Sequence, residues 1–264
     1  MVAPNALNIA NGFNFRDLGG YSTLDGHKIA SHRVIRSASL DRLSPADLSY
    51  LSDYGVSAVV DFRSTAEKDA SPDLLPADAT YHFEPVFSTD ETLTSQAPES
   101  LAQHFSADPH QGFNHMKQTY ADLVRTDTAQ TAYRHFFDVL LDATDTANAV
   151  LFHCTVGKDR TGMGAVYLLS VLGVDAATIR SDYLATNHFM ELPRRYILDK
   201  VVAGGGNAAL QQNLTDLLSA TDAYLDSALT TIDTDFGGMQ RYLHAQLGLD
   251  DDQQGQLRAM YLTH

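Results

Sequence analysis

Short apolar runs alternate with amphipathic stretches along most of the chain. Val56 to Val60 is a β-branched apolar run bounded by a glycine and an aspartate, which predicts a buried strand. Ala149 to Phe152 predicts a second strand, and Tyr81 to Val86 a weaker one. Because such runs alternate with helical patterns, we expect an α/β fold with a central, mostly parallel sheet flanked by helices.

Three helices are expected from end signals and from apolar spacing. A serine, a first-turn proline and a closing glycine predict a helix over about 45–54. From Thr131 onwards apolar residues recur at helical spacing, so this segment should pack on the sheet. The apolar stretch from Gly162 to Leu172 predicts a buried helix directly after the loop at Cys154.

Other segments have less regular patterns. Tyr21 to Ile29 carries Asp-Gly at its centre, which predicts a tight hairpin turn. Residues 88–111 are polar and show little periodicity, so we expect a surface excursion or mobile loop. Leucines between 210 and 229 fall on one face of what should be a long helix, within an added helical segment near 190–230.

Composition narrows the function classes. The 264 residues, 44% of them hydrophobic, suit a single globular domain over residues 1–264. A formal charge of −15 with scattered basic residues disfavours a nucleic-acid partner. No run approaches the roughly 20 apolar residues of a membrane helix, and the first residues lack a charged secretory leader, so we expect a cytoplasmic protein. With one cysteine, Cys154, neither an intramolecular disulfide nor a multi-cysteine zinc site can form.

The segment from His153 to Gly162 carries the candidate chemistry. It reads HCTVGKDRTG, so Cys154 ends a predicted strand and Arg160 follows six positions later, where a helix begins. A loop between strand and helix can aim successive peptide N–H groups at the oxygens of a phosphate, and the helix N-terminus adds a favourable potential. The residues expected to bind phosphate are Thr155, Val156, Gly157, Lys158, Thr161 and Gly162.

These residue types suit covalent phosphoryl transfer. Attack by the Cys154 thiolate would give a phosphocysteine intermediate, while Arg160 offers a planar, two-pronged donor to two phosphoryl oxygens. Gly157 permits a backbone conformation closed to other residues, and Thr161 can hydrogen-bond the sulfur. Neither formation of this intermediate nor its hydrolysis needs a metal or cofactor. The histidines considered as metal ligands, none of which has the required spacing, are His27, His32, His104, His110 and His115.

The signature resembles that of the cysteine-dependent protein tyrosine phosphatase superfamily, in which His-Cys is followed by five residues, Arg and Ser or Thr. More narrowly it is similar to the bacterial dual-specificity, phosphoinositide-phosphatase-like branch, the tyrosine-phosphatase B type. The other segments that match this branch are Asn14–Gly20, Arg36-Ser37, Asp61–Ser64 and Asp182–Leu184. The resemblance implies a phosphatase-like fold and hydrolysis of phosphotyrosine, with phosphoserine, phosphothreonine and phosphoinositides as further candidate substrates.

Two carboxylates compete as the general acid that protonates the leaving oxygen. Asp159 lies in the loop and resembles the acid of this branch, so it is favoured. Asp61 should end its strand at the edge of the sheet where ligands bind, and it could instead orient the loop or contact substrate. Arg63 could pair with Asp61.

The resemblance also implies two features that bear on which substrates are bound. Lys158 adds a second positive charge, which in related lipid phosphatases helps to bind multiply phosphorylated inositol headgroups. Residues 188–230 correspond to a helical lid over the active site in this branch, although a leucine stripe is ordinarily core and a dimer contact would also fit.

Two other function classes compete with a phosphatase. One is a phosphate-binding module that keeps the loop but lacks turnover, and the other is a rhodanese-like sulfurtransferase.

The side chain of His153 should point to the opposite side of the strand from Cys154 and make a structural hydrogen bond. An exposed thiolate without a second cysteine predicts reversible inactivation by peroxide.

Overall fold

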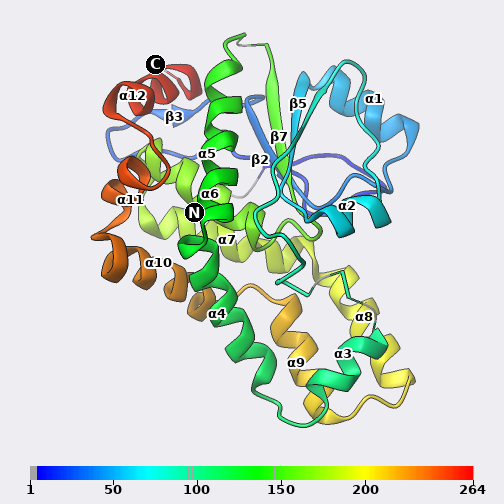
Figure 1. Cartoon of the computed structure of the whole chain (residues 1–264). Helices are drawn as coiled ribbons and strands as arrows, with labels where there is room; N and C mark the ends of the chain where they lie inside the picture. The colour runs from blue at the N-terminus through cyan, green and yellow to red at the C-terminus, as the bar shows by residue number, and fades with distance from the viewer. Residues whose placement is uncertain (1–4, 94, 97, 146, 264) are drawn as a thin grey trace.

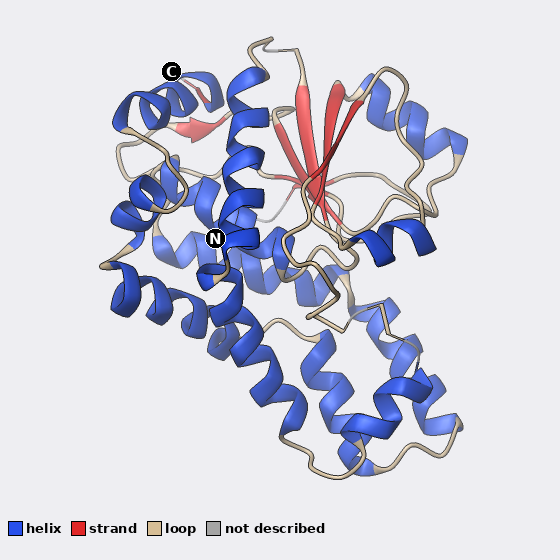
Figure 2. Cartoon of the chain, in the orientation of Figure 1, coloured by secondary structure: helices blue, strands red, loops and turns tan. Residues whose placement is uncertain are grey.

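A six-stranded sheet forms the centre of the computed structural model, which describes residues 5–93, 95–96, 98–145 and 147–263 (Figure 2). The strand order is β1-β2-β4-β7-β5-β6, and β4, β7, β5 and β6 run parallel, whereas β1 and β2 are antiparallel additions at one edge. The bounds are β1 Asn5–Ala6, β2 Arg16–Asp17, β4 Val34–Ser37, β5 Val56–Asp61, β6 Thr80–Phe83 and β7 Ala149–His153. The predicted α/β class with a mostly parallel sheet is confirmed.

Helices cover both faces of the sheet, with α1 and α2 on one side and α5, α6 and α12 on the other (Figure 1). Their bounds are α1 Pro45–Asp53, α2 Thr65–Ala70, α3 Pro98–Phe105, α4 Gln111–Arg125, α5 Asp127–Asp142, α6 Arg160–Val171, α7 Ala176–Phe189, α8 Glu191–Ala203, α9 Ala208–Leu218, α10 Asp222–Phe236, α11 Met239–Ala245 and α12 Asp251–Tyr261. A small second sheet pairs β3 Lys28–Ile29 with β8 Leu262–Thr263.

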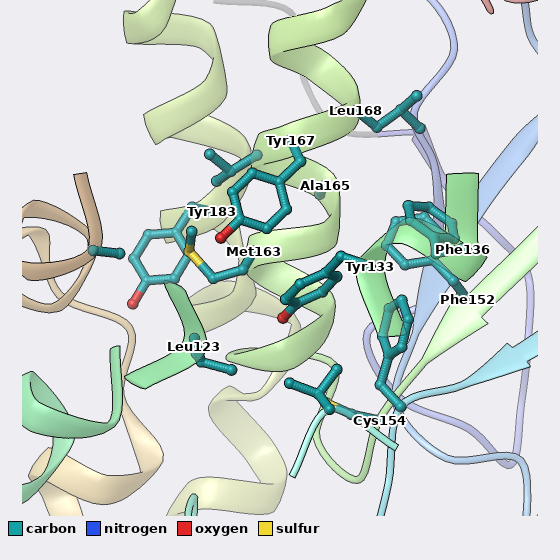
Figure 3. Packing of buried hydrophobic residues seen from close by; sticks show 14 of the residues in the cluster. Leu123, Tyr133, Phe136, Phe152, Cys154, Met163, Ala165, Tyr167, Leu168 and Tyr183 are labelled. Atoms are coloured by element: carbon teal, nitrogen blue, oxygen red, sulfur yellow. The ribbon is translucent and has the colours of Figure 1, made fainter. Parts of the chain in front are cut away.

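The central strands send alternate side chains into two separate cores. Val60 and Phe152 join the large cluster beneath α5 and α6, while Val59 and Leu151 join a smaller one on the other face. Figure 3 shows Phe152 packed with Phe136 of α5 in the large cluster. Burial on both faces explains why these strands have continuous apolar sequences.

Several sequence predictions are confirmed in detail. Helix α1 begins at Pro45 after a capping box formed by Ser44 and Asp47, as its end signals indicate. The expected turn near Asp25-Gly26 is present, because Ser22 pairs with Lys28 in an antiparallel bridge.

Two predictions about the helical segments are wrong. Residues 88–111 include helix α3, whose Leu101 and Phe105 are buried, so the segment is not a loop throughout. The expected long helix over 210–229 is two helices, because Ser219 takes an extended conformation and α10 begins only at Asp222. The break is a short extended segment that apolar spacing alone does not reveal.

Helices α3, α8 and α9 form a helical lobe below the sheet in Figure 1, with α9 packed against both of the others. Leu210, Leu214 and Leu217 of α9 are buried in the main core, so most of this leucine stripe has an ordinary packing role. Among the described residues, no helix has the length and apolar character to cross a membrane.

Candidate active site

The loop from Cys154 to Arg160, called the Cys154 loop below, joins β7 to α6, and its peptide N–H groups are available as hydrogen-bond donors. In the described chain, the peptide N–H groups of residues 155–160 donate to no hydrogen-bond acceptor. Since six successive N–H groups concentrate positive potential, the loop forms an anion-binding cradle at a helix N-terminus.

Cys154 lies at the border of the large core and is only 1% exposed. Figure 3 shows it below Tyr133, whose Oη donates to the carbonyl of Arg160 at 2.9 Å. The expectation of an exposed thiolate is therefore wrong, because the loop wraps the sulfur on one side and the core covers it on the other.

The carbonyl groups of the Cys154 loop are held from outside. Asn14 Nδ2 donates to the carbonyls of Val156 and Gly157, both at 3.0 Å, and Arg36 Nη2 donates to that of Gly157 at 2.8 Å. Gly157 has a φ of +70°, and a Cβ atom there would lie 2.3 Å from the carbonyl oxygen of Ser37. Gly157 is thus required both by conformation and by close approach.

A buried charge network anchors these donors. Asp182 of α7 pairs with Arg16 at 3.0 Å and also with Arg36. Although burial opposes ionisation, the two arginine charges hold the pKa of Asp182 below its usual value. The family-like motifs near residues 14–20, 36–37 and 182–184, far apart in sequence, therefore meet behind the loop. Asp17, by contrast, accepts from the peptide N–H groups of Gly19 and His32, so it stabilises a turn.

Arg160 forms a two-point ion pair with Glu67, a residue that the sequence analysis did not identify as part of the site. Glu67 Oε2 accepts from Arg160 Nη1 at 2.7 Å and Oε1 accepts from Nη2 at 2.9 Å, while Thr155 Oγ1 also donates to Oε1. Burial alone would raise the pKa of Glu67, but the hydrogen bonds and charge of Arg160 lower it to about 2. Arg160 Nε is buried and has no partner within the described residues, so this donor is free for a ligand.

Asp159 lies in a buried polar cluster next to the loop. Tyr120 Oη of α4 donates to Asp159 Oδ1 at 2.8 Å, and Lys158 Nζ lies 3.4 Å from the same oxygen. The Asp159 side chain is 2% exposed. The favoured acid candidate thus lies five positions after Cys154 in the sequence and is held by Tyr120, a residue 39 positions away.

Asp61 and Arg63 form a closed ion-pair cluster. Arg63 Nε lies 3.0 and 3.1 Å from the two oxygens of Asp61, and Arg63 Nη2 also pairs with Asp73, so the predicted Arg63–Asp61 pairing is confirmed. Burial opposes ionisation, but the charges of His153 and Arg63 and the hydrogen bonds of Arg63 and Tyr81 hold the pKa of Asp61 well below its usual value.

His153 belongs to this cluster rather than to the thiol side. Its Nε2 lies 3.3 Å from Asp73 Oδ2 and its Nδ1 lies 3.2 Å from the carbonyl of Cys154, which agrees with the expected structural hydrogen bond. Asp61, Asp73 and His153 are close enough to share a metal ion. The guanidinium of Arg63 already neutralises both carboxylates, however, so the donor set does not suit a cation.

Two side chains of the signature, Lys158 in the loop and Thr161 at the start of α6, differ from expectation. Lys158 Nζ donates to the carbonyls of Leu217 and Ser219 at the end of α9, so its charge joins the loop to the helical lobe instead of facing a headgroup. Burial lowers the pKa of Lys158. Thr161 Oγ1 is buried without a partner among the described residues, so the predicted bond to sulfur is not made in this state.

A pocket of about 650 Å³ reaches the loop through Thr155 and Glu67. Ile197 of the helical lobe lines it, together with Met190 just before α8 and Phe13. A molecule in this pocket would meet both apolar side chains, such as Phe13 and Ile197, and polar ones, such as Thr155 and Glu67.

Comparison with known proteins extends the match beyond the loop. A model of the tyrosine phosphatase family matches residues 7–263. The chain is 32% identical over 252 residues to a candidate tyrosine-protein phosphatase of Cupriavidus necator, covering 95% of this chain and 86% of the relative. It is 27% identical to a protein of Nostoc commune named tyrosine-protein phosphatase, covering 87% and 74%. It is 28% identical to the triple specificity protein phosphatase PtpB of Mycobacterium tuberculosis, covering 88% and 90%.

Proposed function

The chain belongs to the tyrosine phosphatase family and is a hydrolase of phosphate monoesters, and we propose that it releases phosphate from phosphotyrosine through a phosphocysteine formed on Cys154. The observation that carries this assignment is the cradle of six free peptide N–H groups between Cys154 and Arg160, with the orphaned Nε of Arg160 beside it. A dianionic phosphoryl group would satisfy these donors together.

In the first step, the Cys154 sulfur attacks phosphorus and the bond from phosphorus to the leaving oxygen breaks. The loop N–H groups and Arg160 hold the equatorial oxygens, and Asp159 donates its proton to the leaving oxygen. Asp61 is a poor alternative acid, because its ion pair with Arg63 keeps it ionised and its side chain is fully buried.

In the second step, a water molecule attacks the phosphocysteine. Asp159, now a carboxylate, accepts a proton from this water, and the sulfur leaves as a thiolate. The unpartnered hydroxyl of Thr161 is a suitable donor to the departing sulfur. The loop holds the same oxygens throughout, so no other group needs to change place.

We further propose that the substrate is a phosphorylated protein and that the enzyme works in the cytoplasm, where a catalytic thiol stays reduced. The name of the Mycobacterium tuberculosis relative supports tests on phosphoserine and phosphothreonine peptides. Phosphoinositides belong in the same test, but Lys158 would have to leave the carbonyls of Leu217 and Ser219 to meet a second phosphate.

The helical lobe is proposed to act as a cover within a single domain. Ile197 lines the pocket from α8, while Leu192, Tyr196 and Val202 of the same helix are exposed apolar side chains. A helix that borders a pocket on one side and leaves apolar groups in solvent on the other is suited to shift when a substrate enters.

The experiment that tests the function measures phosphate release from a phosphotyrosine peptide and from a phosphoinositide, with chelator present. We expect the wild type to be active on the peptide, Cys154→Ser to be inactive, and Asp159→Asn to be slowed by about 100-fold or more. Asp252→Asn, an exposed change on α12, is the matched control and should keep full activity.

If the wild type releases no phosphate, further measurements distinguish the two alternative functions. A wild type that binds the phosphopeptide without releasing phosphate would be a binding module. Formation of thiocyanate from thiosulfate and cyanide, without phosphate release, would instead indicate a rhodanese-like sulfurtransferase.

A further inference from the structure

Asp159 has two chemically distinct oxygens in this structure. Oδ1 accepts from Tyr120 Oη at 2.8 Å and lies 3.4 Å from Lys158 Nζ, whereas no described residue hydrogen-bonds Oδ2. A neutral carboxyl group carries one proton. With donors already directed at Oδ1, that proton belongs on Oδ2.

Tyr120 is itself held by a second buried phenol. Tyr183 Oη of α7 donates to Tyr120 Oη at 2.8 Å, so the chain of donation runs from Tyr183 through Tyr120 to Asp159. Each hydroxyl has one proton, and this direction satisfies both. Burial, followed by the charge of Asp159, raises the pKa of Tyr120 well above its usual value, so Tyr120 stays a donor at any working pH.

We propose that Tyr120, oriented by Tyr183, is a positioning residue for the acid: it fixes the rotamer of Asp159 so that Oδ2 carries the proton for the leaving oxygen. The inference rests on the proposed function. Tyr120 does not touch the substrate, and its effect on the reaction passes through Asp159.

The packing around Tyr120 allows its hydroxyl to be removed by mutation while the ring is kept. The ring packs on Tyr183 and Tyr224, with centroids 6.0 and 5.7 Å away, so a phenylalanine would fill the same space. Removing only the Tyr120 hydroxyl would leave that of Tyr183 without its acceptor, at a cost of about 1–3 kcal/mol in stability. The double variant Tyr120→Phe/Tyr183→Phe removes both hydroxyls and gives a second, better balanced test.

The experiment compares substrates that differ in their need for an acid. We measure kcat/KM, which covers the steps up to departure of the leaving group, for 4-nitrophenyl phosphate and phenyl phosphate. For Tyr120→Phe, kcat/KM should fall about 10-fold with phenyl phosphate and less than about 2-fold with 4-nitrophenyl phosphate, whose leaving group departs without protonation. The double variant should show the same selectivity.

Two comparisons separate positioning from folding. In an Asp159→Asn background, Tyr120→Phe should cause no further loss, because its effect acts through the missing acid. Tyr261→Phe is the matched control, since Tyr261 Oη is also buried but donates to the carbonyl of Leu140 outside the site, at 2.8 Å. It should leave the ratio of the two kcat/KM values unchanged.

Each outcome has a distinct meaning. If the wild type releases no phosphate, the proposed function fails. If the wild type is active but Tyr120→Phe and the double variant slow both substrates equally, or slow neither, the positioning role alone is overturned. A further loss in the Asp159→Asn background would also overturn it.

Discussion

The Cys154 loop and helix α8 border the same pocket but are built on different principles. The loop is surrounded by buried polar partners: Asn14 and Arg36 hold its carbonyls, and Glu67 holds Arg160. Helix α8 has one buried residue, Val201. Its Leu192 and Tyr196 are 66% and 61% exposed.

This difference fits the roles proposed above for the two regions. A loop that stabilises a transition state works best when its donors are fixed before the substrate arrives, because reorganisation then costs nothing during the reaction. A cover over a pocket must admit substrates of different shape, and a weakly packed helix can do so. Substitutions should therefore reduce activity strongly when they lie in the loop and only slightly when they lie in α8.

The largest effect is expected for Gly157→Ala. The new Cβ would lie 2.3 Å from the carbonyl oxygen of Ser37, and φ of +70° disfavours alanine, so the loop has to move. A displacement of about 1 Å should cost at least about 100-fold in kcat/KM for 4-nitrophenyl phosphate. Gly26→Ala is the control, because Gly26 has a φ of +91° but nothing within 4 Å of the added Cβ. Equal activity of the two variants would contradict a preformed loop.

A loss of similar size is expected for Arg160→Lys. Lysine keeps the charge but loses the planar fork that reaches both Glu67 and a phosphoryl group, so kcat should fall about 100- to 1000-fold. Steady-state kinetics with Arg134→Lys as control check this result, because Arg134 lies on α5 outside the site and pairs with Asp138. An Arg160→Lys variant with near wild-type kcat would mean that charge alone suffices.

The strand–loop–helix arrangement around Cys154 was predictable because it is local. Cys154, Gly157 and Arg160 lie within seven consecutive residues whose positions are set by one strand and one helix. The parallel sheet was predictable for a related reason, since strands buried on both faces have continuous apolar runs.

The partners of the loop depend on tertiary folding and were not predictable in the same way. Glu67 meets Arg160 across 93 positions, and Tyr120 meets Asp159 across 39. A local signal did exist for Glu67, because Ser64 and Glu67 have capping-box spacing directly after the strand that ends at Asp61. That signal predicts a helix start but not the ion pair that the same carboxylate makes.

Glu67→Gln should mainly affect stability. Glu67 is ionised in the fold with a pKa of about 2, below the usual 4.5, so its contribution is fully present above pH 4.5 and is lost as the pH falls towards 2. The shift corresponds to a difference in the free energy of unfolding on the order of 3 kcal/mol at pH 7. Urea unfolding of both proteins at several pH values measures it.

The control for this change is Glu191→Gln, an exposed substitution at the start of α8. It should shift the free energy of unfolding by less than about 0.5 kcal/mol at every pH. A wild-type advantage over Glu67→Gln that stayed constant between pH 7 and pH 3 would show that the pair with Arg160 is not its source.

The smallest effect is expected in α8, where two apolar residues on one helix differ in position. Ile197 lines the pocket and Leu192 does not. Ile197→Ala should raise KM for a phosphotyrosine peptide about 5-fold, because apolar contact with the substrate is lost, while kcat/KM for 4-nitrophenyl phosphate stays within about 2-fold. Leu192→Ala should change neither value, and both variants should keep wild-type stability within about 0.5 kcal/mol. If Leu192→Ala affected the peptide as strongly as Ile197→Ala, the helix would act as a whole, and the contrast between a fixed loop and an adaptable cover would have to be tested by restraining α8 against α9.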